Sequence, residues 1–470
     1  MRTHRSMTVV TVLSIAALAA GTGAVTAQSP SAAAPAATGY TELDQAMGAD
    51  QPFKGTKVSI QTQWIGGEGD NFAAALKPFE DATGIDVVVD QIGSSHETVL
   101  RTRIEGGAPP DLAMLAQPSA IVEYGKAGKL VDIAAMLGAD GVKKLSDEHP
   151  ATIGLYSSDS SIWAIPYKVD VKSTVWYPIK AFAAAGYKVP TTYDELVALE
   201  AQIVKDGSNP WCIGMEAGTA TGWQATDWLE YIVLRTAGID AYNKWITHEL
   251  KFDSPEITKA MGILHDIFFT EGNVYGGSTA IVATPQTQPM DPMFPTDGNW
   301  DGFKPGCWMQ KQATWYGPDF FPDQRTSGQP SQYKLGDDIG IFYFPPIDPA
   351  QGTPALGAGD ALMVLADRPE VRAAAEFLST PAGLEAWIKA GSALSANQTT
   401  PADWYAGNYK LEVASGIVAN ATSFGFDASD LMPSVVGAGS FWTEMVNWIS
   451  ANGADTEARL QAIDASWPAP

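Results

Sequence analysis

Segments 64–70 and 116–119 carry aromatic, acidic and amide side chains, and each follows a predicted strand. An aromatic ring packs well against the apolar face of a sugar ring, while carboxylates and amides hydrogen-bond its hydroxyl groups. In open α/β sheets, ligands bind beyond the carboxyl ends of the strands. We therefore expect a site for a polyhydroxylated ligand at these two segments.

The patterns that would indicate catalysis or metal binding are missing from the sequence. There is no G-x-S-x-G elbow, and GKAGK at 125–129 is too short for a phosphate-binding loop. The five histidines are scattered, with no two at the spacing of zinc ligands. The acidic pairs Asp337–Asp338 and Asp427–Asp430 lack the pattern of a calcium loop. We predict no catalytic residue, no metal and no cofactor.

The elements that must position these side chains alternate along the first part of the chain. Strands are predicted at 57–63, 85–89 and 112–115, and helices at 72–84, 96–105 and 120–125. This alternation predicts an α/β fold with a mixed sheet flanked by helices. Further on, 193–270 is predicted to be mainly helical and 339–344 to be a strand. Later helices are expected at 369–378, 381–390 and 441–451, the last one being the final helix.

The composition excludes some partners. The net charge is −24, from 53 acidic and 29 basic residues. Such a chain repels phosphate, so we expect no nucleic-acid binding. With 45% hydrophobic residues the chain is globular. Its only two cysteines are Cys212 and Cys307, and in an oxidising compartment an isolated pair suggests a disulfide.

The first residues indicate export. Residues 1–27 have the charge, apolar run and small final residues of a cleavable signal peptide. No cysteine follows the run, so a lipid anchor is not expected, and we predict a periplasmic or extracellular protein. Residues 28–55 are rich in Ala, Pro and Ser and are interpreted as a disordered linker. No later segment has the length and apolarity of a membrane span, so membrane contact is expected only through a partner.

From about Lys57 to Trp467, the sequence resembles the extracellular solute-binding proteins of carbohydrate ABC transporters. Within this maltose-binding-like family it is most similar to the alpha-glucoside-binding group. Seven segments carry the resemblance by their order and spacing: 64–85, 106–133, 163–178, 209–230, 305–314, 357–364 and 426–433.

The resemblance implies a two-lobed α/β fold in which a hinge closes the lobes on a sugar. The N-terminal lobe is expected from 56–168 and 346–392, and the C-terminal lobe from 169–345 and 393–470. The first crossing between the lobes is placed near 169–174, and the return near Pro345. A match to the group's cysteine positions supports a Cys212–Cys307 bridge in the second lobe.

Eight ligand-binding residues are carried over from the family by position: Trp64, Glu68, Gln117, Asp170, Lys172, Trp223, Asp227 and Asp360. Some have structural alternatives, because Glu68 and Asp227 suit helix caps and Asp170 suits an ion pair with a nearby lysine. We favour Asp360 and Trp64, because both are expected in Gly-flanked turns with little other reason to be buried. The turn at Asp360 departs from the group, which more often has two adjacent glycines where Gly357 and Gly359 flank Ala358.

The family resemblance implies a non-catalytic transport protein. We expect it to bind an alpha-glucoside-type di- or oligosaccharide as a monomer and to deliver it to permease subunits. One alternative is a binding protein for a non-sugar solute, although the scarcity of Arg in the candidate loops counts against phosphate. Another is a secreted glycoside hydrolase, which needs two carboxyl groups on either side of one bond.

Overall fold

The computed structural model describes residues 37–469, which belong to one compact unit. The predicted signal peptide at 1–27 lies outside the described residues, as does the first part of the 28–55 segment. Within 37–469, no helix is both long enough and apolar enough to cross a membrane.

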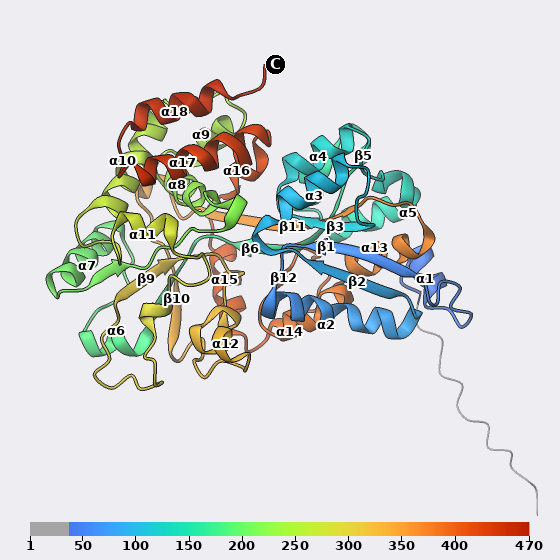
Figure 1. The fold of residues 1–470 in the computed structure, drawn as a ribbon, viewed down its shortest axis with the longest axis horizontal. Coiled ribbons are helices and arrows are strands. Elements are labelled where there is room, and N and C mark those ends of the chain that lie inside the picture. Colours follow the sequence, from blue (N-terminus) through green and yellow to red (C-terminus); the bar gives the residue numbers. More distant parts are fainter. Residues whose placement is uncertain (1–36, 470) are drawn as a thin grey trace, which may run out of the picture. The chain divides into compact units, whose positions relative to one another are not determined.

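Two principal sheets organise the chain (Figure 1). The larger sheet has the order β12-β6-β11-β3-β1-β2, with β13 paired to β11. Its strands are β1 (Lys57–Thr62), β2 (Asp86–Gln91), β3 (Leu112–Leu115), β6 (Ile165–Val171), β11 (Ala355–Val364), β12 (Leu394–Ser395) and β13 (Phe424–Phe426). The smaller sheet has the order β10-β7-β9-β8, from β7 (Thr174–Pro178), β8 (Asn209–Trp211), β9 (Cys307–Lys311) and β10 (Ile339–Tyr343). A separate hairpin joins β4 (Ser157–Ser158) to β5 (Ser161–Ile162).

Helices surround both sheets. Those of the first half of the chain are α1 (Thr41–Ala46), α2 (Gly66–Thr83), α3 (His96–Glu105), α4 (Pro118–Lys126), α5 (Ile133–Glu148), α6 (Ile179–Ala185), α7 (Tyr193–Lys205), α8 (Trp223–Thr236) and α9 (Gly238–Ile246). The others are α10 (Pro255–Phe269), α11 (Ser278–Ala283), α12 (Pro322–Ser327), α13 (Pro369–Ser379), α14 (Glu385–Lys389), α15 (Tyr409–Ala419), α16 (Ala428–Leu431), α17 (Trp442–Ser450) and α18 (Thr456–Ala465).

The predicted mixed α/β fold is confirmed. In the larger sheet β1 pairs with β2 and β3 in parallel, while β11 runs antiparallel to β3 and β6. The apolar spacing of Phe72, Leu76 and Phe79 buries one face of α2, and the helix ends at Gly84 in the left-handed conformation at φ 71°. Each principal sheet has its own apolar core. We call the parts built on the larger and smaller sheets the N-terminal and C-terminal lobes.

The chain passes from the larger sheet to the smaller one after β6 and back again before β11. Strand β6 lies in the larger sheet and β7 in the smaller one, so the first crossing falls at Lys172 and Ser173. The return runs from β10 to β11. The predicted lobe boundaries at 168/169 and 392/393 stay a prediction, and strands β6 and β12 of the larger sheet extend past them.

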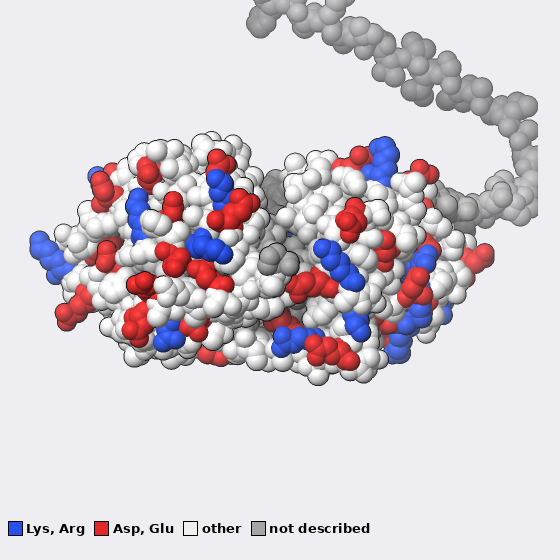
Figure 2. Space-filling model, turned by 90° about the horizontal axis from the view of Figure 1, so that it is seen from above, with Lys and Arg blue, Asp and Glu red and all other residues white. Residues whose placement is uncertain are grey.

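The predicted disulfide is present in the C-terminal lobe. The sulfur atoms of Cys212 and Cys307 are 2.04 Å apart, and the bond joins the end of β8 to the start of β9. On the outer face shown in Figure 2, acidic and basic side chains are interspersed among uncharged ones.

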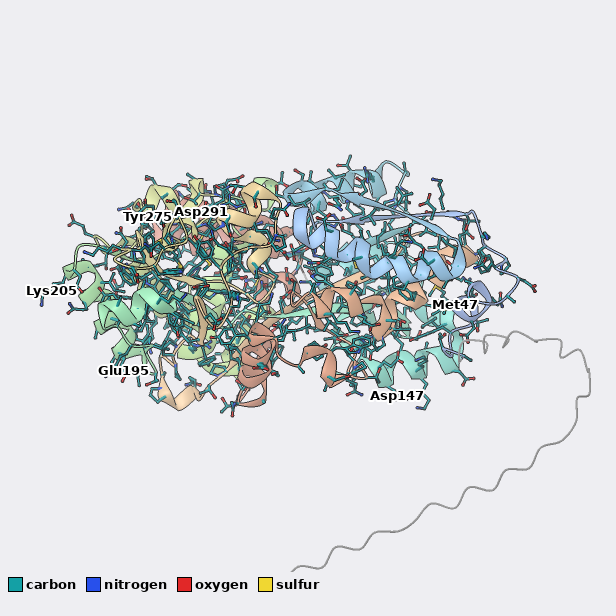
Figure 3. The ribbon with its side chains drawn as sticks, turned by 90° about the horizontal axis from the view of Figure 1, so that it is seen from below. Met47, Asp147, Glu195, Lys205, Tyr275 and Asp291 are labelled. Carbon is teal, nitrogen blue, oxygen red and sulfur yellow. A yellow bond between two sulfur atoms is a disulfide. The ribbon has the colours of Figure 1, made fainter. Side chains whose placement is uncertain are left out.

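Two expectations about the ends of the chain are wrong. The interpretation of 28–55 as a linker fails for α1, because Tyr40, Leu43 and Ala46 are buried in the core of the N-terminal lobe. The Leu43 amide donates to the Glu376 carboxylate of α13 at 2.7 Å, and Met47 follows at the end of the helix (Figure 3). A short helix in an Ala-rich segment gives little periodic signal, so tertiary packing decides it. The helix at 441–451 is also not the last, because α18 follows it.

We expect Leu43→Ala to lower the free energy of unfolding by about 2–5 kcal/mol, because a fully buried leucine leaves a cavity when truncated. Urea denaturation of the protein containing residues 37–470 measures it. Val418→Ala on α15 is the control, since Val418 is 45% exposed and should change stability little. Equal effects of the two substitutions would contradict a structural role for α1.

Candidate ligand-binding cleft

A cavity of about 320 Å³ lies between the two lobes and is lined by residues of both. Its volume is in the range of small-molecule sites. Seven of the eight predicted site residues line it: Trp64, Glu68, Gln117, Asp170, Lys172, Trp223 and Asp360. Seven acidic side chains contribute to the lining: Glu68, Glu97, Asp170, Glu216, Asp360, Asp427 and Asp430. The only basic side chains among the described lining residues are Lys168 and Lys172.

The wall from the N-terminal lobe is built around the Lys168 ammonium. Its Nζ lies 2.6 Å from Asp170 Oδ2 and 3.4 Å from Asp360 Oδ2. Asp170 is on the same strand two residues on, so both side chains project from one face of β6. Asp170 therefore forms the lysine pair that was its structural alternative, and it lines the cavity as well.

The expectation of a tight turn at Asp360 is wrong. Residues 355–364 form a continuous strand, and the ladder with β6 shifts register between Asp360 and Ala361. The two glycines make room for neighbours, because a Cβ on Gly359 would lie 2.6 Å from the Lys168 carbonyl oxygen. Ala358 itself lines the cavity, so this position accommodates a side chain. Gln63 donates to Asp360 Oδ1 at 2.5 Å and holds the carboxylate in place.

Trp64 is far more buried than expected. It is 2% exposed and packs edge-on against Trp387, with ring centroids 4.8 Å apart, and near Phe72 at 5.0 Å. The ring therefore belongs to the core of the N-terminal lobe, and the residue also lines the cavity.

Glu68 and Gln117 stand at the starts of two helices. Glu68 lies in the first turn of α2, whose N-cap residue is Ile65, so Glu68 is not the cap. Burial raises the pKa of Glu68 to about 8, and nearby Asp170 and Asp360 raise it further, against the lowering effect of Lys168. Gln117 is the residue before α4, is 7% exposed and lines the cavity.

The wall from the C-terminal lobe combines aromatic side chains with three acidic ones, Glu216, Asp427 and Asp430. Trp223 begins α8, and its indole N–H donates to Gln286 Oε1 at 2.8 Å. Its ring centroid lies 6.1 Å from that of Trp315, and both line the cavity with Phe320 and Trp442. Lys172 Nζ lies 5.1 Å from the Trp223 ring centroid.

Asp227 does not reach the cavity wall. It lies one helical turn beyond Trp223 and accepts a hydrogen bond from Lys172 Nζ at 2.8 Å, while Asp427 binds the same ammonium at 2.5 Å. Burial raises the pKa of Asp227 to about 7, and the charge on Lys172 opposes that rise. Asp227 is therefore placed to position Lys172, and the cap alternative is wrong because Gly222 precedes the helix.

The carboxylates of Asp227, Glu230 and Asp427 come close enough together to hold a cation. Their oxygens already have partners, however. Lys172 lies between Asp227 and Asp427, and Glu230 accepts from the amides of Ala428 and Ser429 at 2.8 and 3.0 Å. The carboxylates of this cluster are therefore engaged in an internal ion pair with Lys172 and in hydrogen bonds to backbone amides.

Several lining residues escaped the sequence analysis. The place of Lys168 in the cavity lining could have been predicted, because Lys168 lies two residues before Asp170 and so points to the same face of the strand. No pattern in the sequence indicates that Glu97 lines the cavity, since Glu97 belongs to a helix of ordinary composition. Trp315 and Trp442 come from segments far apart in the sequence, and only the fold brings them together.

Direct contacts bridge the two lobes at the rim of the cavity. Asn71 of α2 donates to Asp319 Oδ2 at 3.3 Å, and Gly67 leaves room for Asp319, whose Cβ would lie 2.7 Å from a Cβ at position 67. Thr219 Oγ1 donates to the Ser94 carbonyl at 3.2 Å, and the Ser434 amide donates to Glu123 at 3.0 Å. The cleft is therefore closed.

The sequence profile described as bacterial extracellular solute-binding protein matches residues 65–385. The chain belongs to this family. This solute-binding protein is 35% identical over 420 residues to the alpha-glucosides-binding periplasmic protein AglE of Rhizobium meliloti, covering 87% of each chain. It is 34% identical over 412 residues to the osmoprotective compounds-binding protein GgtB of Synechocystis sp., covering 88% of this chain and 92% of that protein.

Solved structures share the fold. The bacterial solute receptor AcbH has a TM-score of 0.73 at 15% identity, over 87% of this chain and 98% of that one. RafE in complex with raffinose has a TM-score of 0.65 at 18% identity, over 88% and 98%. The predicted family and the two-lobed fold of this solute-binding protein are thereby confirmed.

We expect Gly67→Ala to hinder closure of the solute-binding protein, because the new methyl group would meet Asp319 across the cleft. Alanine favours helix more than glycine does, so α2 itself should not weaken. Small-angle X-ray scattering should report a larger radius of gyration than for the unchanged protein. Gly262→Ala in α10 is the matched control, because a Cβ there meets nothing within 4 Å. An unchanged radius in Gly67→Ala would contradict this role.

Stability should fall between pH 6.5 and 8. Burial raises the pKa of Glu68 and Glu376 to about 8 and of Glu200 to about 7, so the folded state holds protons that the unfolded state has lost. Their contribution is complete below the ordinary glutamate pKa and is lost as pH rises through these values. His96, whose burial lowers its pKa to about 4, opposes this only below about pH 6.5.

Urea denaturation at pH 6.5, 7 and 8 tests this expectation. Glu68→Gln should show a smaller decrease than the unchanged protein, because the amide does not titrate. A decrease of the same size in both proteins would remove Glu68 from the explanation.

Proposed function

We propose that this protein is the sugar-binding component of an ABC importer and captures an alpha-glucoside-type di- or oligosaccharide. The observation that carries the proposal is the pairing of two unlike walls across one closed cavity. The C-terminal lobe presents the rings of Trp223 and Trp315, and the N-terminal lobe presents the carboxylates of Asp170 and Asp360. A pyranose ring has the same two characters, with an apolar face and a rim of hydroxyls.

The carboxylates suit hydroxyl donors. Lys168 holds Asp170 and Asp360 in fixed positions, which lowers the entropy that ordering them on a ligand would cost. A closed cavity also excludes water, so each hydrogen bond to the sugar is stronger than in solution.

Relatives support the class of ligand. AglE is described as binding alpha-glucosides, and similarity to it covers most of both chains. GgtB is described as binding osmoprotective compounds, and this favours a second candidate, a small polyhydroxylated solute that protects cells against osmotic stress. Both candidates need hydroxyl recognition, so they differ mainly in how much of the cavity the ligand fills.

We propose no hydrolysis of the bound sugar. A glycosidase needs one carboxyl group as acid and one as base or nucleophile on either side of the scissile bond. Here Asp170 and Asp360 share one lysine on a single wall, and on the facing wall Asp427 is paired with Lys172. We further propose that the protein acts outside the cytoplasm as a monomer and passes its ligand to permease subunits.

Thermal-shift screening of the purified protein against alpha- and beta-linked glucosides and osmoprotective polyols tests the proposal. A ligand that binds only the folded state at a hundred times its Kd stabilises by about 2.7 kcal/mol. We expect the largest shift with an alpha-glucoside and recovery of that sugar intact. Trp223→Ala should reduce the shift, whereas Val418→Ala, outside the cavity, should not.

Cleavage of the sugar would favour the hydrolase, and a larger shift with the osmoprotective polyols would favour the second candidate. No shift with any of these compounds would overturn the proposal.

A further inference from the structure

Acidic side chains outnumber basic ones in the lining of the cavity. On the outer face in Figure 2, charges of both signs alternate, whereas seven carboxyl groups and two ammonium groups line the cavity. No arginine is among the described residues of the lining. A ligand in this cavity therefore meets an excess of negative charge.

Both lysines of the lining are already neutralised. Lys168 lies between Asp170 and Asp360, and Lys172 lies between Asp227 and Asp427. Neither ammonium is therefore available to a carboxylate or phosphate of a ligand unless it gives up an internal partner. Breaking a buried pair leaves a buried charge uncompensated, which is strongly unfavourable.

Four acidic side chains of the lining form no ion pair among residues 37–469: Glu68, Glu97, Glu216 and Asp430. Burial raises the pKa of Glu97 to about 7, and nearby Asp360 adds to that rise. Glu68 faces Lys168, Asp170, Asp360 and Asp319, and three of these four neighbours are acidic.

We propose that the cleft accepts glycosides bearing a protonated amine and rejects those bearing a carboxylate or phosphate. The proposal rests on the proposed sugar-binding function and names a charge class within it. An ammonium group beside Glu68 or Glu97 would compensate its charge, and Trp223, Trp315 and Trp442 contribute aromatic rings to the same cavity. An anionic group at that position would meet mainly acidic neighbours, because the nearby ammonium of Lys168 is already paired with Asp170 and Asp360.

Proton release should accompany binding of the amine. A cation placed beside Glu68 and Glu97 favours their charged forms, so protons that these groups hold near pH 7 leave on binding. A neutral glycoside brings no charge and should release far fewer protons. Proton release therefore separates an electrostatic preference from a difference in shape.

Isothermal titration calorimetry with three matched ligands tests the inference. They are the best alpha-glucoside of the thermal-shift screen, its analogue with an amine in place of the 6-hydroxyl, and its analogue with a carboxylate there. At pH 7 and low salt, we expect the amine to bind at least as tightly as the parent. The carboxylate should bind about tenfold or more weaker than the parent, and the difference should shrink at high salt. Titrations in two buffers of different ionisation enthalpy count the protons released.

Glu97→Gln should narrow the ratio of amine to carboxylate affinity, with both affinities measured relative to that of the neutral parent in the same variant. Glu105→Gln is the matched control, because Glu105 lies exposed on the same helix and outside the cavity. It should leave the ratio as it is.

The outcomes separate the two proposals. If the parent glucoside does not bind, the sugar-binding function fails and this inference fails with it. If the parent binds but the carboxylate binds as tightly as the amine, the function stands and the inference is overturned. An unchanged ratio in Glu97→Gln would likewise overturn the assignment to Glu97.

Discussion

The arrangement of the cleft depends on the buried ammonium group of Lys168. It is 2% exposed, and a buried charge is strongly unfavourable unless it is paired and hydrogen-bonded. Asp170 and Asp360 supply the pairing from two neighbouring strands, so β6 and β11 must lie in register beside the cavity. In turn, Gly359 must lack a side chain for β11 to approach the backbone of Lys168. The buried charge of Lys168 thus constrains the pairing of β6 with β11, the positions of Asp170 and Asp360, and the glycine at position 359.

A second buried lysine, Lys172, is also paired with two carboxylates and lies at the crossing between the lobes. Residues 168 and 170 share one face of β6 because side chains alternate along a strand, and Lys172 follows directly after its last residue, Val171. Lys168 is neutralised within the N-terminal lobe, while Lys172 is neutralised by Asp227 on α8 and Asp427 at the start of α16. Ion pairs therefore hold the chain in place on both sides of the crossing, and Lys168 and Lys172 both line the cavity.

Much of this fold can be predicted from the sequence, and the predictions that failed did so for physical reasons. Helix α3 and strand β3 were predicted to the residue, because α3 buries one face and β3 is a short apolar run that is buried throughout. Asp360 was misassigned because Gly-Ala-Gly-Asp looks like a turn, although these glycines serve close strand packing. The resemblance to a known family placed seven of the eight residues at the cavity. Trp315 and Glu97 were missed because their place in the cavity depends on non-local packing, which no local pattern records.

The contacts described between the lobes at the rim of the cavity are hydrogen bonds and not ion pairs. Those of Asn71 with Asp319 and of Thr219 with Ser94 are single hydrogen bonds, and such bonds contribute about 1 kcal/mol each on a net basis. A closed state held this weakly remains close in free energy to an open one. A ligand that touches both lobes needs only a modest preference for the closed state to shift the populations. The strong interactions of the cleft lie within each wall, where they fix geometry, and the weak ones lie between the lobes, where reversible release of the ligand requires them.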